Sequence, residues 1–307
     1  MSKTHLELPS SLIEIEIDGS VVTAPKGSTI LEACRGAGAE QPTLCYLENL
    51  TPVNTCRVCV VEVVGSRALV PACSRPIEPN MEISTDSERV RHSRRMVFDL
   101  LESSVDLSLV DDSTRSWMER YRIDSPSDDD STEPSGERVD RVKSYHVSHP
   151  VLPATVAQPV KIEDDLYIRD YAKCILCYKC VEACGPDAQN TFAIAVGGRG
   201  FESRITTEFD VVLPDSACVY CGNCIGVCPT GALMFKSEFD LRAAGRWDES
   251  SQTVTTTVCS YCGVGCNLEL TVQDNEIVKV TSPLDHDVTS GHLCIKGRFG
   301  YQHVQNR

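Results

Sequence analysis

The feature that most constrains this chain is a doubled cysteine run between residues 174 and 228. The spacing C-x2-C-x2-C-x3-C occurs twice, with an insertion between the copies. Three thiols two residues apart on a tight loop can face one metal centre, whereas the fourth, at the start of a helix, points away. The whole chain holds 17 cysteines. In a reducing compartment, clustered cysteines indicate bound metal rather than disulfides.

This doubled spacing resembles bacterial two-cluster ferredoxins, in which the fourth cysteine of each run serves the other [4Fe–4S] cluster. The resemblance assigns one cluster to Cys174, Cys177, Cys180 and Cys228. It assigns the second cluster to Cys218, Cys221, Cys224 and Cys184. A pair of zinc knuckles is the alternative, because C-x2-C pairs also suit tetrahedral zinc.

Length and charge limit the possible classes of protein. A chain of 307 residues has room for two or three small domains. The first residues lack the apolar core of a secretory signal, and no apolar run is long enough to span a membrane. We therefore expect a soluble, cytoplasmic protein. The net charge of -15 argues against nucleic-acid binding, which needs clustered Lys and Arg.

The N-terminal region has the pattern of a β-hairpin followed by a helix. Ile13, Ile15 and Ile17 alternate with acidic residues, which predicts a half-buried strand that turns at Asp18-Gly19. Thr29 with Glu32 has the spacing of a capping box at the start of the next helix. This order begins a ubiquitin-like β-grasp fold, on which plant-type ferredoxins are built.

Four further cysteines follow in a C-x10-C-x2-C-x13-C pattern. The first gap is longer than that of plant-type ferredoxins. The pattern resembles the N-terminal [2Fe–2S] domains of the NADH dehydrogenase large subunit, iron-only hydrogenases and several formate dehydrogenases. The resemblance implies that the ligands are Cys45, Cys56, Cys59 and Cys73. Cys34 remains, and its apolar neighbours predict a small core residue, with a redox or ligand role as the alternative.

Residues 86–123 have a helical pattern, with Val90, Val97, Phe98 and Leu101 close to one face. A basic run, which consists of Arg89, Arg91, Arg94 and Arg95, is typical of the solvated side of a helix. The alternative is a docking face for an acidic partner or a pterin phosphate. His92 is followed by no cysteine before Cys174, so we expect no additional cluster here and assign His92 to the surface or to packing.

The middle of the chain contains a change of composition. Residues 124–160 are acidic and rich in turn formers, which predicts a linker. Residues 161–242 hold the doubled cysteine run. Between its copies, residues 192–196 and 209–213 read as two strands around a glycine turn. The glycines there do not form a dinucleotide-binding fingerprint.

The last stretch has a different cysteine spacing. A predicted strand at residues 254–258 leads into C-x2-C-x3-C-x27-C, which ends in Cys-Ile-Lys-Gly. This resembles the N-terminal cluster domain of molybdenum or tungsten bis-pterin oxidoreductases, most closely cytoplasmic formate dehydrogenase large subunits. The resemblance implies a [4Fe–4S] cluster on four ligands, with Lys296 between that cluster and a pterin. These ligands are Cys259, Cys262, Cys266 and Cys294. A structural zinc ribbon is the alternative.

Together these patterns predict an α+β chain of successive cluster domains. They are a β-grasp plant-type [2Fe–2S] ferredoxin domain (1–85), a helical connector (86–123), a linker (124–160), a 2[4Fe–4S] ferredoxin domain with a hairpin insertion (161–242) and a small β-rich [4Fe–4S] cap domain (253–307). One [2Fe–2S] and three [4Fe–4S] clusters would use all cysteines except Cys34.

The resemblance further implies a role in electron transfer. The chain would carry electrons between a molybdenum- or tungsten-bis-pterin guanine dinucleotide, held by a partner or a further domain, and a diaphorase, quinone-linked or ferredoxin acceptor. An electron-transfer subunit of an NADH dehydrogenase or NAD-linked hydrogenase is the second hypothesis, although we do not expect it to account for the motif from Cys259 to Cys294. A scaffold with structural metals is the third. Because no residue here matches a pterin-bound metal ligand or a substrate-binding group, we expect no complete catalytic site.

Overall fold

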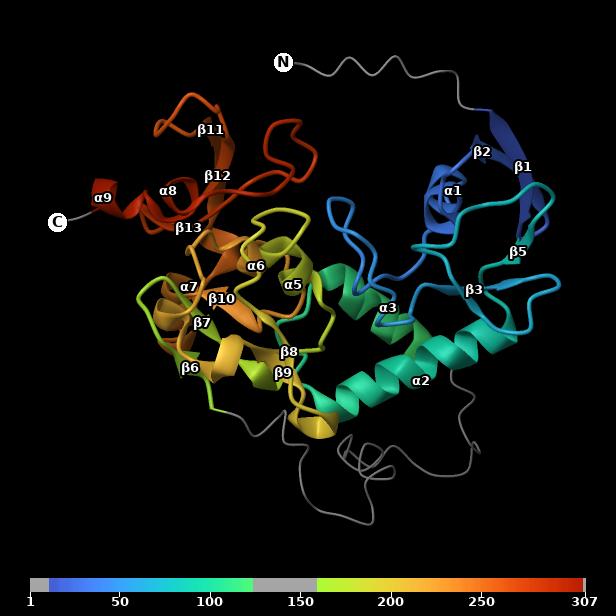
Figure 1. Ribbon diagram of the computed structural model, residues 1–307, viewed down its shortest axis with the longest axis horizontal. Coiled ribbons are helices and arrows are strands. Elements are labelled where there is room, and N and C mark those ends of the chain that lie inside the picture. Colours follow the sequence, from blue (N-terminus) through green and yellow to red (C-terminus); the bar gives the residue numbers. More distant parts are fainter. Residues whose placement is uncertain (1–10, 124–158, 306–307) are drawn as a thin grey trace, which may run out of the picture. The chain divides into compact units, whose positions relative to one another are not determined.

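A computed structural model describes residues 11–123 and 159–305 (Figure 1). These residues fall into two compact units. The N-terminal unit comprises residues 11–46, 54–101 and 112–123, and the C-terminal unit comprises residues 47–53, 102–111 and 159–305. The linker predicted at 124–160 lies almost entirely outside the described residues. Within these residues, no helix is both long enough and apolar enough to cross a membrane.

The N-terminal unit begins with the expected hairpin, β1 (Leu12–Ile17) and β2 (Ser20–Pro25). The side chains of β1 alternate between exposed and buried, and Ile13, Ile15 and Ile17 face the core. α1 (Ile30–Gly36) follows. Its capping box is formed as predicted, since the hydroxyl of Thr29 accepts from the backbone of Glu32 at 3.2 Å and the Glu32 carboxylate accepts from Thr29 at 2.6 Å.

The hairpin is part of a five-stranded sheet in the order β2-β1-β5-β3-β4. The remaining strands are β3 (Val60–Val63), β4 (Val70–Pro71) and β5 (Glu82–Ser84). β5 is parallel to β1, and the other neighbours are antiparallel. The inward residues of β1 and α1 form one hydrophobic core with Cys34, which is fully buried. Cys34 is therefore a core residue, as its neighbours predicted.

The helical stretch consists of two helices, α2 (Glu88–Ser104) and α3 (Asp112–Ile123). Val90 and Phe98 are buried, as the pattern predicted. The prediction of a solvated basic run was wrong for Arg94, which is only 1% exposed. The reason is its long-range hydrogen bonding, because the guanidinium donates to Gln41 at 2.6 Å, to the Val60 carbonyl at 2.8 Å and to the Tyr121 hydroxyl at 2.5 Å.

The C-terminal unit holds the doubled cysteine run on a three-stranded sheet. Its strands are β6 (Lys161–Ile162), β7 (Tyr167–Arg169) and β10 (Leu233–Phe235), in the order β10-β7-β6. The first run continues from a 3-10 turn (Tyr171–Lys173) into α5 (Lys179–Cys184), and the second run enters α6 (Asn223–Gly226). α7 (Lys236–Ala243) follows the sheet and is followed by a 3-10 turn (Glu249–Ser251).

The insertion between the runs contains a hairpin of β8 (Ala195–Gly197) and β9 (Arg204–Thr206). Three 3-10 turns flank β9, at Gly200–Glu202, Glu208–Asp210 and Leu213–Asp215. The prediction of a strand at 209–213 was therefore wrong. Phe209 and Asp210 both have positive φ, at 54° and 55°, and this backbone conformation cannot continue an extended strand.

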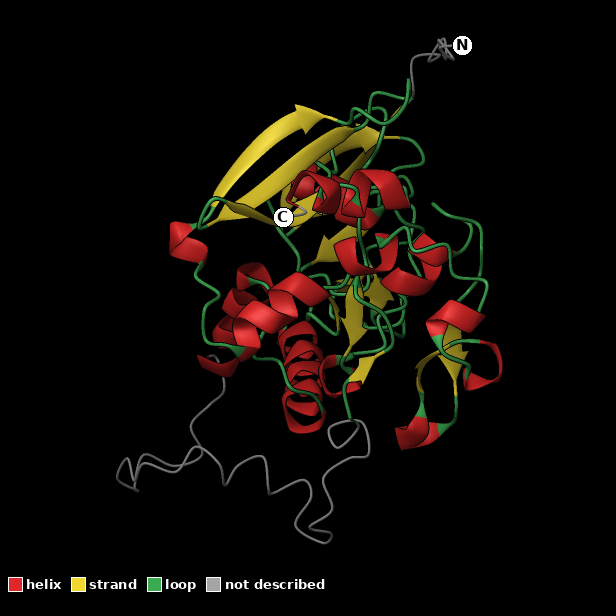
Figure 2. Ribbon diagram, turned by 90° about the vertical axis from the view of Figure 1, so that its left-hand side faces the viewer, coloured by secondary structure: helices red, strands yellow, loops and turns green. Residues whose placement is uncertain are grey.

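The last part of the C-terminal unit is a three-stranded antiparallel sheet, β11-β12-β13. Its strands are β11 (Thr253–Val258), β12 (Asn267–Gln273) and β13 (Glu276–Thr281), with a turn at Asp274-Asn275. The short helices α8 (Ile295–Phe299) and α9 (Gln302–Gln305) end the described chain. Figure 2 shows this sheet as the largest group of yellow strands.

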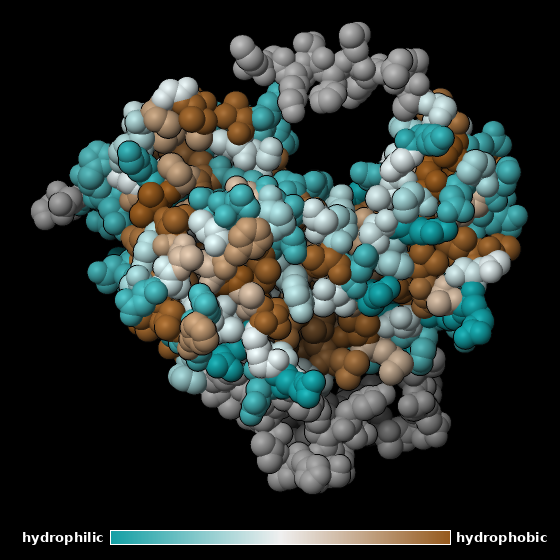
Figure 3. Space-filling model, viewed as in Figure 1, coloured by the Kyte–Doolittle hydropathy of each residue, from teal (hydrophilic) through white to brown (hydrophobic). Residues whose placement is uncertain are grey.

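Exposed apolar side chains occur in both units. On the face drawn in Figure 3, hydrophobic residues are interspersed with hydrophilic ones. Among the side chains that the structure describes in the C-terminal unit, the most exposed large apolar one is Phe209, at 91%. Scattered exposure of this kind is normal for a protein surface.

Candidate metal-cluster sites

All 17 cysteines lie in described residues, and none forms a disulfide. Sixteen of them gather in four groups of four, which match the groups expected from the cysteine spacing. Their role as ligands stays a prediction.

The first group of the C-terminal unit lines a small cavity of about 20 Å³. Its members are Cys174, Cys177, Cys180 and Cys228. Leu176 and Tyr178 have positive φ, at 51° and 67°, and so curl the loop of the first run. Cys228 comes from the second run, so the structure brings together the cross-over set that the resemblance implied.

The second group lines another cavity of about 20 Å³. Its members are Cys184, Cys218, Cys221 and Cys224. Here the loop is curled by Tyr220 and Gly222, with φ of 56° and 69°. The repeated loop geometry on both runs follows from the repeated spacing. Cys184 comes from the first run, which completes the exchange of fourth cysteines.

Burial makes these thiols poor acids on their own. It is the largest cause that raises the pKa of Cys174 to about 11 and that of Cys177 to about 12. Burial likewise raises the pKa of Cys180 and Cys224 well above the usual value, with neighbouring thiolates adding to the effect. An iron-bound cysteine is a thiolate, so the positive charge of bound iron would be needed to hold four buried sulfurs in the ionised state.

In the N-terminal unit the four thiols form two close pairs. Cys45 and Cys56 share a side-chain hydrogen bond, and so do Cys59 and Cys73. Within the second pair, this bond is the largest cause that lowers the pKa of Cys59 and raises that of Cys73. The pairing fits a [2Fe–2S] centre, because each of its two irons takes two of the four thiolates. Asn54 lies beside this group, with its side-chain oxygen 3.3 Å from Cys73 Sγ and accepting from the Ser74 hydroxyl at 2.6 Å.

The fourth group lies at the edge of the β11-β12-β13 sheet. Its members are Cys259, Cys262, Cys266 and Cys294. Burial raises the pKa of Cys266, and the charges of the other three thiols raise it further, which places all four within electrostatic range of one another. Cys262 and Cys294 are exposed. Lys296, on the first turn of α8, is also exposed.

The chemistry of the donor sets, four thiols in each, suits iron–sulfur clusters. In the described part of the chain, no three His, Cys, Asp or Glu side chains meet closely enough to ligate one metal ion. Four thiols spaced around a cavity have another geometry, since each cysteine of a [4Fe–4S] cluster binds a separate iron at a corner of the cube. The residues present therefore fit the clusters that their spacing implies.

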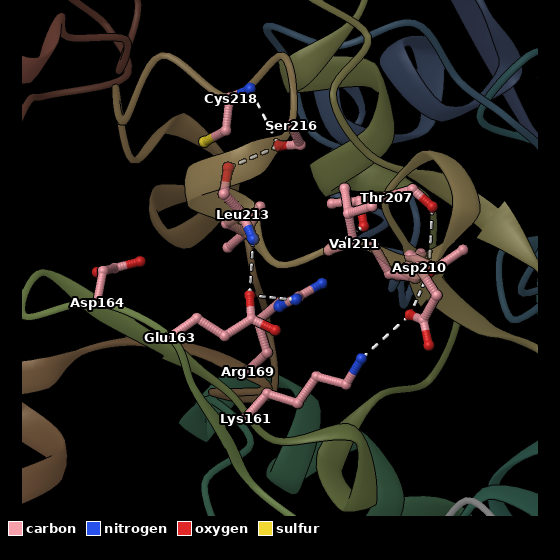
Figure 4. Close-up of polar contacts among 12 residues, drawn as sticks. Lys161, Glu163, Asp164, Arg169, Thr207, Asp210, Val211, Leu213, Ser216 and Cys218 are labelled. Atoms are coloured by element: carbon pink, nitrogen blue, oxygen red, sulfur yellow. Dashed lines mark hydrogen bonds and ion pairs between the residues drawn. The ribbon is translucent and has the colours of Figure 1, made fainter.

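A polar network holds the loop that carries Cys218 (Figure 4). The Glu163 carboxylate accepts from Arg169 at 2.5 Å and from the Leu213 backbone at 3.0 Å. The Ser216 hydroxyl then donates to the Leu213 carbonyl at 2.8 Å and accepts from the Cys218 backbone at 3.2 Å. Buried charge is thereby neutralised, and the start of the second run is fixed to the strands of the sheet.

A second part of this network fixes the turn of the insertion (Figure 4). Asp210 accepts from Thr206 at 2.7 Å, from Arg204 at 3.0 Å and from Lys161 at 3.1 Å. The Thr206 hydroxyl is the largest cause that lowers the pKa of Asp210, followed by Lys161. Asp210 is thus ionised at neutral pH, and its contacts connect this turn to β9 and β6.

Two residues that the sequence did not single out contact the Cys184/218/221/224 group. The Tyr167 hydroxyl lies 3.0 Å from Cys218 Sγ, and burial is the main cause that raises the pKa of Tyr167. Arg298 is fully buried and donates to the Cys221 carbonyl at 3.0 Å and to Asn223 at 3.1 Å. The spacing of the motif gives no signal for Tyr167, whereas Arg298 lies within the Cys-Ile-Lys-Gly-Arg-Phe stretch.

Three family models match separate parts of the chain. A 2Fe-2S iron-sulfur cluster binding domain matches residues 10–88, and a 4Fe-4S dicluster domain matches residues 173–232. A molybdopterin oxidoreductase Fe4S4 domain matches residues 252–306. This chain carries three iron–sulfur domains. One is of the 2Fe-2S type and two are of the 4Fe-4S type, each in a region where the structure groups cysteines.

Whole-chain relatives of these iron–sulfur domains are oxidoreductases and their subunits. An NADH-quinone oxidoreductase subunit of Rhizobium meliloti is 31% identical over 96% of this chain and 32% of its own length. A putative formate dehydrogenase of Staphylococcus haemolyticus is 26% identical over 95% of this chain and 31% of its own length. The chain thus spans about a third of the length of these curated relatives.

A solved structure shares the fold. A chain of an NAD+-reducing [NiFe]-hydrogenase in the H2-reduced state matches with a TM-score of 0.55 and 24% identity, covering 73% of this chain and 87% of that one. At this identity the likeness concerns the fold alone.

One expectation about the C-terminal motif was wrong. We expected the motif from Cys259 to Cys294 to fall outside the NADH dehydrogenase class. The NADH-quinone oxidoreductase relative, however, aligns over 96% of this chain. The motif therefore does not exclude that class.

Proposed function

We propose that this chain is the iron–sulfur electron relay of a molybdenum- or tungsten-pterin oxidoreductase of the formate dehydrogenase type. The observation that carries the proposal is the joining of two cysteine groups by α8. Its N-cap is Cys294, which belongs to the C-terminal group. Four residues later, Arg298 donates to the carbonyl of Cys221, which belongs to the neighbouring group.

The ligand assignment follows the four cysteine groups, one for a [2Fe–2S] centre and three for [4Fe–4S] centres. Bound clusters of these kinds supply one-electron transfer. The chain's own residues hold the sulfurs in place, bury them and set their hydrogen bonding, which determines the cluster potentials. The hairpin, α1 and the mixed sheet support a β-grasp layout for the N-terminal unit. The domain boundaries predicted at 85, 123, 160 and 242 are part of the same proposal.

Lys296 is proposed to lie beside a pterin bound by a partner or a further domain. Its exposure, next to the exposed Cys294, supports this, because an electron donor must come close to this centre from outside the described residues. At the other end of the relay we propose a diaphorase, quinone-linked or ferredoxin acceptor. We also propose a cytoplasmic location, since clustered metal-binding thiols are typical of reducing compartments.

The second candidate is an electron-transfer subunit of an NADH dehydrogenase or NAD-linked hydrogenase module. It is favoured by the Rhizobium relative. We prefer the first candidate because the model that matches residues 252–306 is a molybdopterin oxidoreductase domain.

Anaerobic isolation of the native complex, through a tag on this chain, distinguishes the two candidate functions. Formate should then reduce the clusters, seen as new electron paramagnetic resonance (EPR) signals, and molybdenum or tungsten should co-purify in stoichiometric amount. NADH serves as the comparison substrate. Reduction by NADH but not by formate, with neither heavy metal present, would replace this proposal by the second candidate.

A further inference from the structure

The two cysteine groups of the doubled run are alike in their backbone but differ in the hydroxyl group that lies nearest to sulfur. In both groups, backbone N–H groups point at sulfur: those of Leu176 and Lys179 in one group, and those of Tyr220 and Asn223 in the other. The buried phenol of Tyr167 lies 3.0 Å from Cys218 Sγ. The other hydroxyls near sulfur are farther away, since Thr191 lies 3.4 Å from Cys184 Sγ and Thr230 lies 3.9 Å from Cys228 Sγ.

The first group also has a buried tyrosine nearby, but its hydroxyl forms a hydrogen bond with the backbone. Tyr171 is also buried and follows Tyr167 by four residues, but its hydroxyl donates to the carbonyl of Ile205. Thr230, near Cys228, likewise gives its proton to the Lys173 carbonyl at 2.6 Å. Each of these two hydroxyls thus donates its proton to a carbonyl oxygen and has none left to donate to sulfur.

The direction of the Tyr167 hydrogen bond follows from the state of the sulfur. A cysteine that binds iron has lost its proton, so the phenol must be the donor and the thiolate the acceptor. Reduction adds one electron to the centre with no bond made or broken. The added negative charge strengthens this hydrogen bond, and a hydrogen bond that favours the reduced form raises the reduction potential.

The Tyr167 ring is held by the helix that follows the C-terminal cysteine group. Phe299 stacks on Tyr167, with ring centroids 6.3 Å apart and planes at 18°. Phe235 meets Phe299 edge-on, with centroids 5.7 Å apart. Arg298 anchors the same turn through its bond to Cys221. The phenol is therefore fixed in the orientation that brings its hydroxyl to sulfur.

Positive charge does not make the same distinction between the groups. Arg298 lies within electrostatic range of Cys221 and Cys224, while Lys179 lies near Cys177 in the other group. Arg169 lines the second cavity, but Glu163 neutralises it at 2.5 Å. Each group thus has one nearby buried cation, and the phenol remains as the difference.

We propose that Tyr167 is a positioning residue that raises the reduction potential of the centre held by Cys184, Cys218, Cys221 and Cys224, and so makes the two ferredoxin-type centres unequal. This inference rests on the proposed cluster assignment. Of the two ferredoxin-type centres, the one next to α8 would then be reduced first. Phe299, which holds the Tyr167 ring, connects this difference in potential to the helix of the C-terminal group.

The test is an EPR-monitored redox titration of the reconstituted full chain with dithionite. Tyr167→Phe removes one oxygen atom and should lower the midpoint potential of one [4Fe–4S] centre while the others stay unchanged. The matched control, Tyr171→Phe, should leave all potentials unchanged. The Cys184→Ala variant should lack the titration step of the centre that Cys184 helps to hold. The affected centre is identified if this missing step is the one that Tyr167→Phe shifts.

A second variant is expected to shift the same midpoint potential in the opposite direction. Site-specific 3-fluorotyrosine at position 167 keeps the hydroxyl and makes it a stronger donor, so it should raise the same potential. Unchanged potentials in both Tyr167 variants, with all clusters present, would overturn the inference and leave the cluster assignment standing. A wild-type chain without three [4Fe–4S] signals would instead contradict the proposed function, and the inference with it.

Discussion

The guanidinium of Arg94 donates to the carbonyl oxygen of Val60 at 2.8 Å, directly after the cysteine Cys59. Two further bonds, to Gln41 and Tyr121, tie α2 to the segment before Cys45 and to α3. The buried arginine is thus part of the framework of the proposed [2Fe–2S] site, although its sequence context resembles a solvated basic run.

Replacing Arg94 tests this framework. A lysine cannot reach three acceptors at once, so Arg94→Lys should leave buried acceptors without a donor and cost about 2–4 kcal/mol of stability. Thermal loss of [2Fe–2S] absorbance should move several degrees lower. Arg95→Lys, on the neighbouring position of the same helix, is the control and should unfold like the wild type. Equal behaviour of the two variants would contradict the role of Arg94.

Gly222 is expected to be intolerant of a side chain. Its φ is +69°, and a Cβ there would lie 2.4 Å from Cδ of Arg298. Gly222→Ala should therefore combine backbone strain with displacement of Arg298, at a cost of about 2–3 kcal/mol. The measurement is the unfolding temperature of the holoprotein under anaerobic conditions. Gly263→Ala is the control, because a Cβ there meets nothing within 4 Å, and a similar loss in both would refute the explanation.

Cys34 should be the cysteine that no cluster uses. Burial raises its pKa to about 11, so at pH 8 only about one thiol in a thousand is ionised. The native holoprotein should hence react slowly with iodoacetamide, and the reaction should speed up as the pH rises toward 11 or when the protein unfolds. Cys34→Ala should retain its full iron content. Loss of one cluster from this variant would show that the assignment of sixteen ligands is wrong.

Single ligand replacements should remove single clusters. Cys294→Ala is expected to eliminate one [4Fe–4S] signal and leave the other three centres, because the C-terminal group has its own four cysteines. Cys228→Ala should affect the centre of the first run, even though Cys228 belongs to the second. EPR with iron analysis checks both variants. Loss of all centres from Cys294→Ala, or of none, would contradict the grouping.

Local signals predicted much of the fold. The alternation at β1 and the capping box at Thr29 are recorded in residues close together in the sequence. The four cysteine groups follow from characteristic spacings, although some of their members are far apart in the chain. The insertion was harder, because Phe209, Val211 and Val212 read as a strand. Asp210 favours a turn only through its bonds to Thr206 and to residues farther away, and such contacts leave no local pattern.

The surroundings of the candidate clusters were the least predictable part. Tyr167 and Cys218 are far apart in the sequence, and their contact depends on how β7 meets the second run. Arg94 resembled a solvated residue because the acceptors that bury it, Gln41 and the Val60 carbonyl, come from other elements. Spacing identifies the residues that can hold a cluster, whereas long-range packing determines how that cluster would be tuned.

The central claim is that the four cysteine groups hold iron–sulfur clusters. Iron and acid-labile sulfide, counted on the anaerobically purified chain, test it most directly. We predict about 14 iron atoms and about 14 sulfides per chain, with visible absorbance that bleaches on adding dithionite. A colourless protein that contains zinc and no labile sulfide would contradict the account.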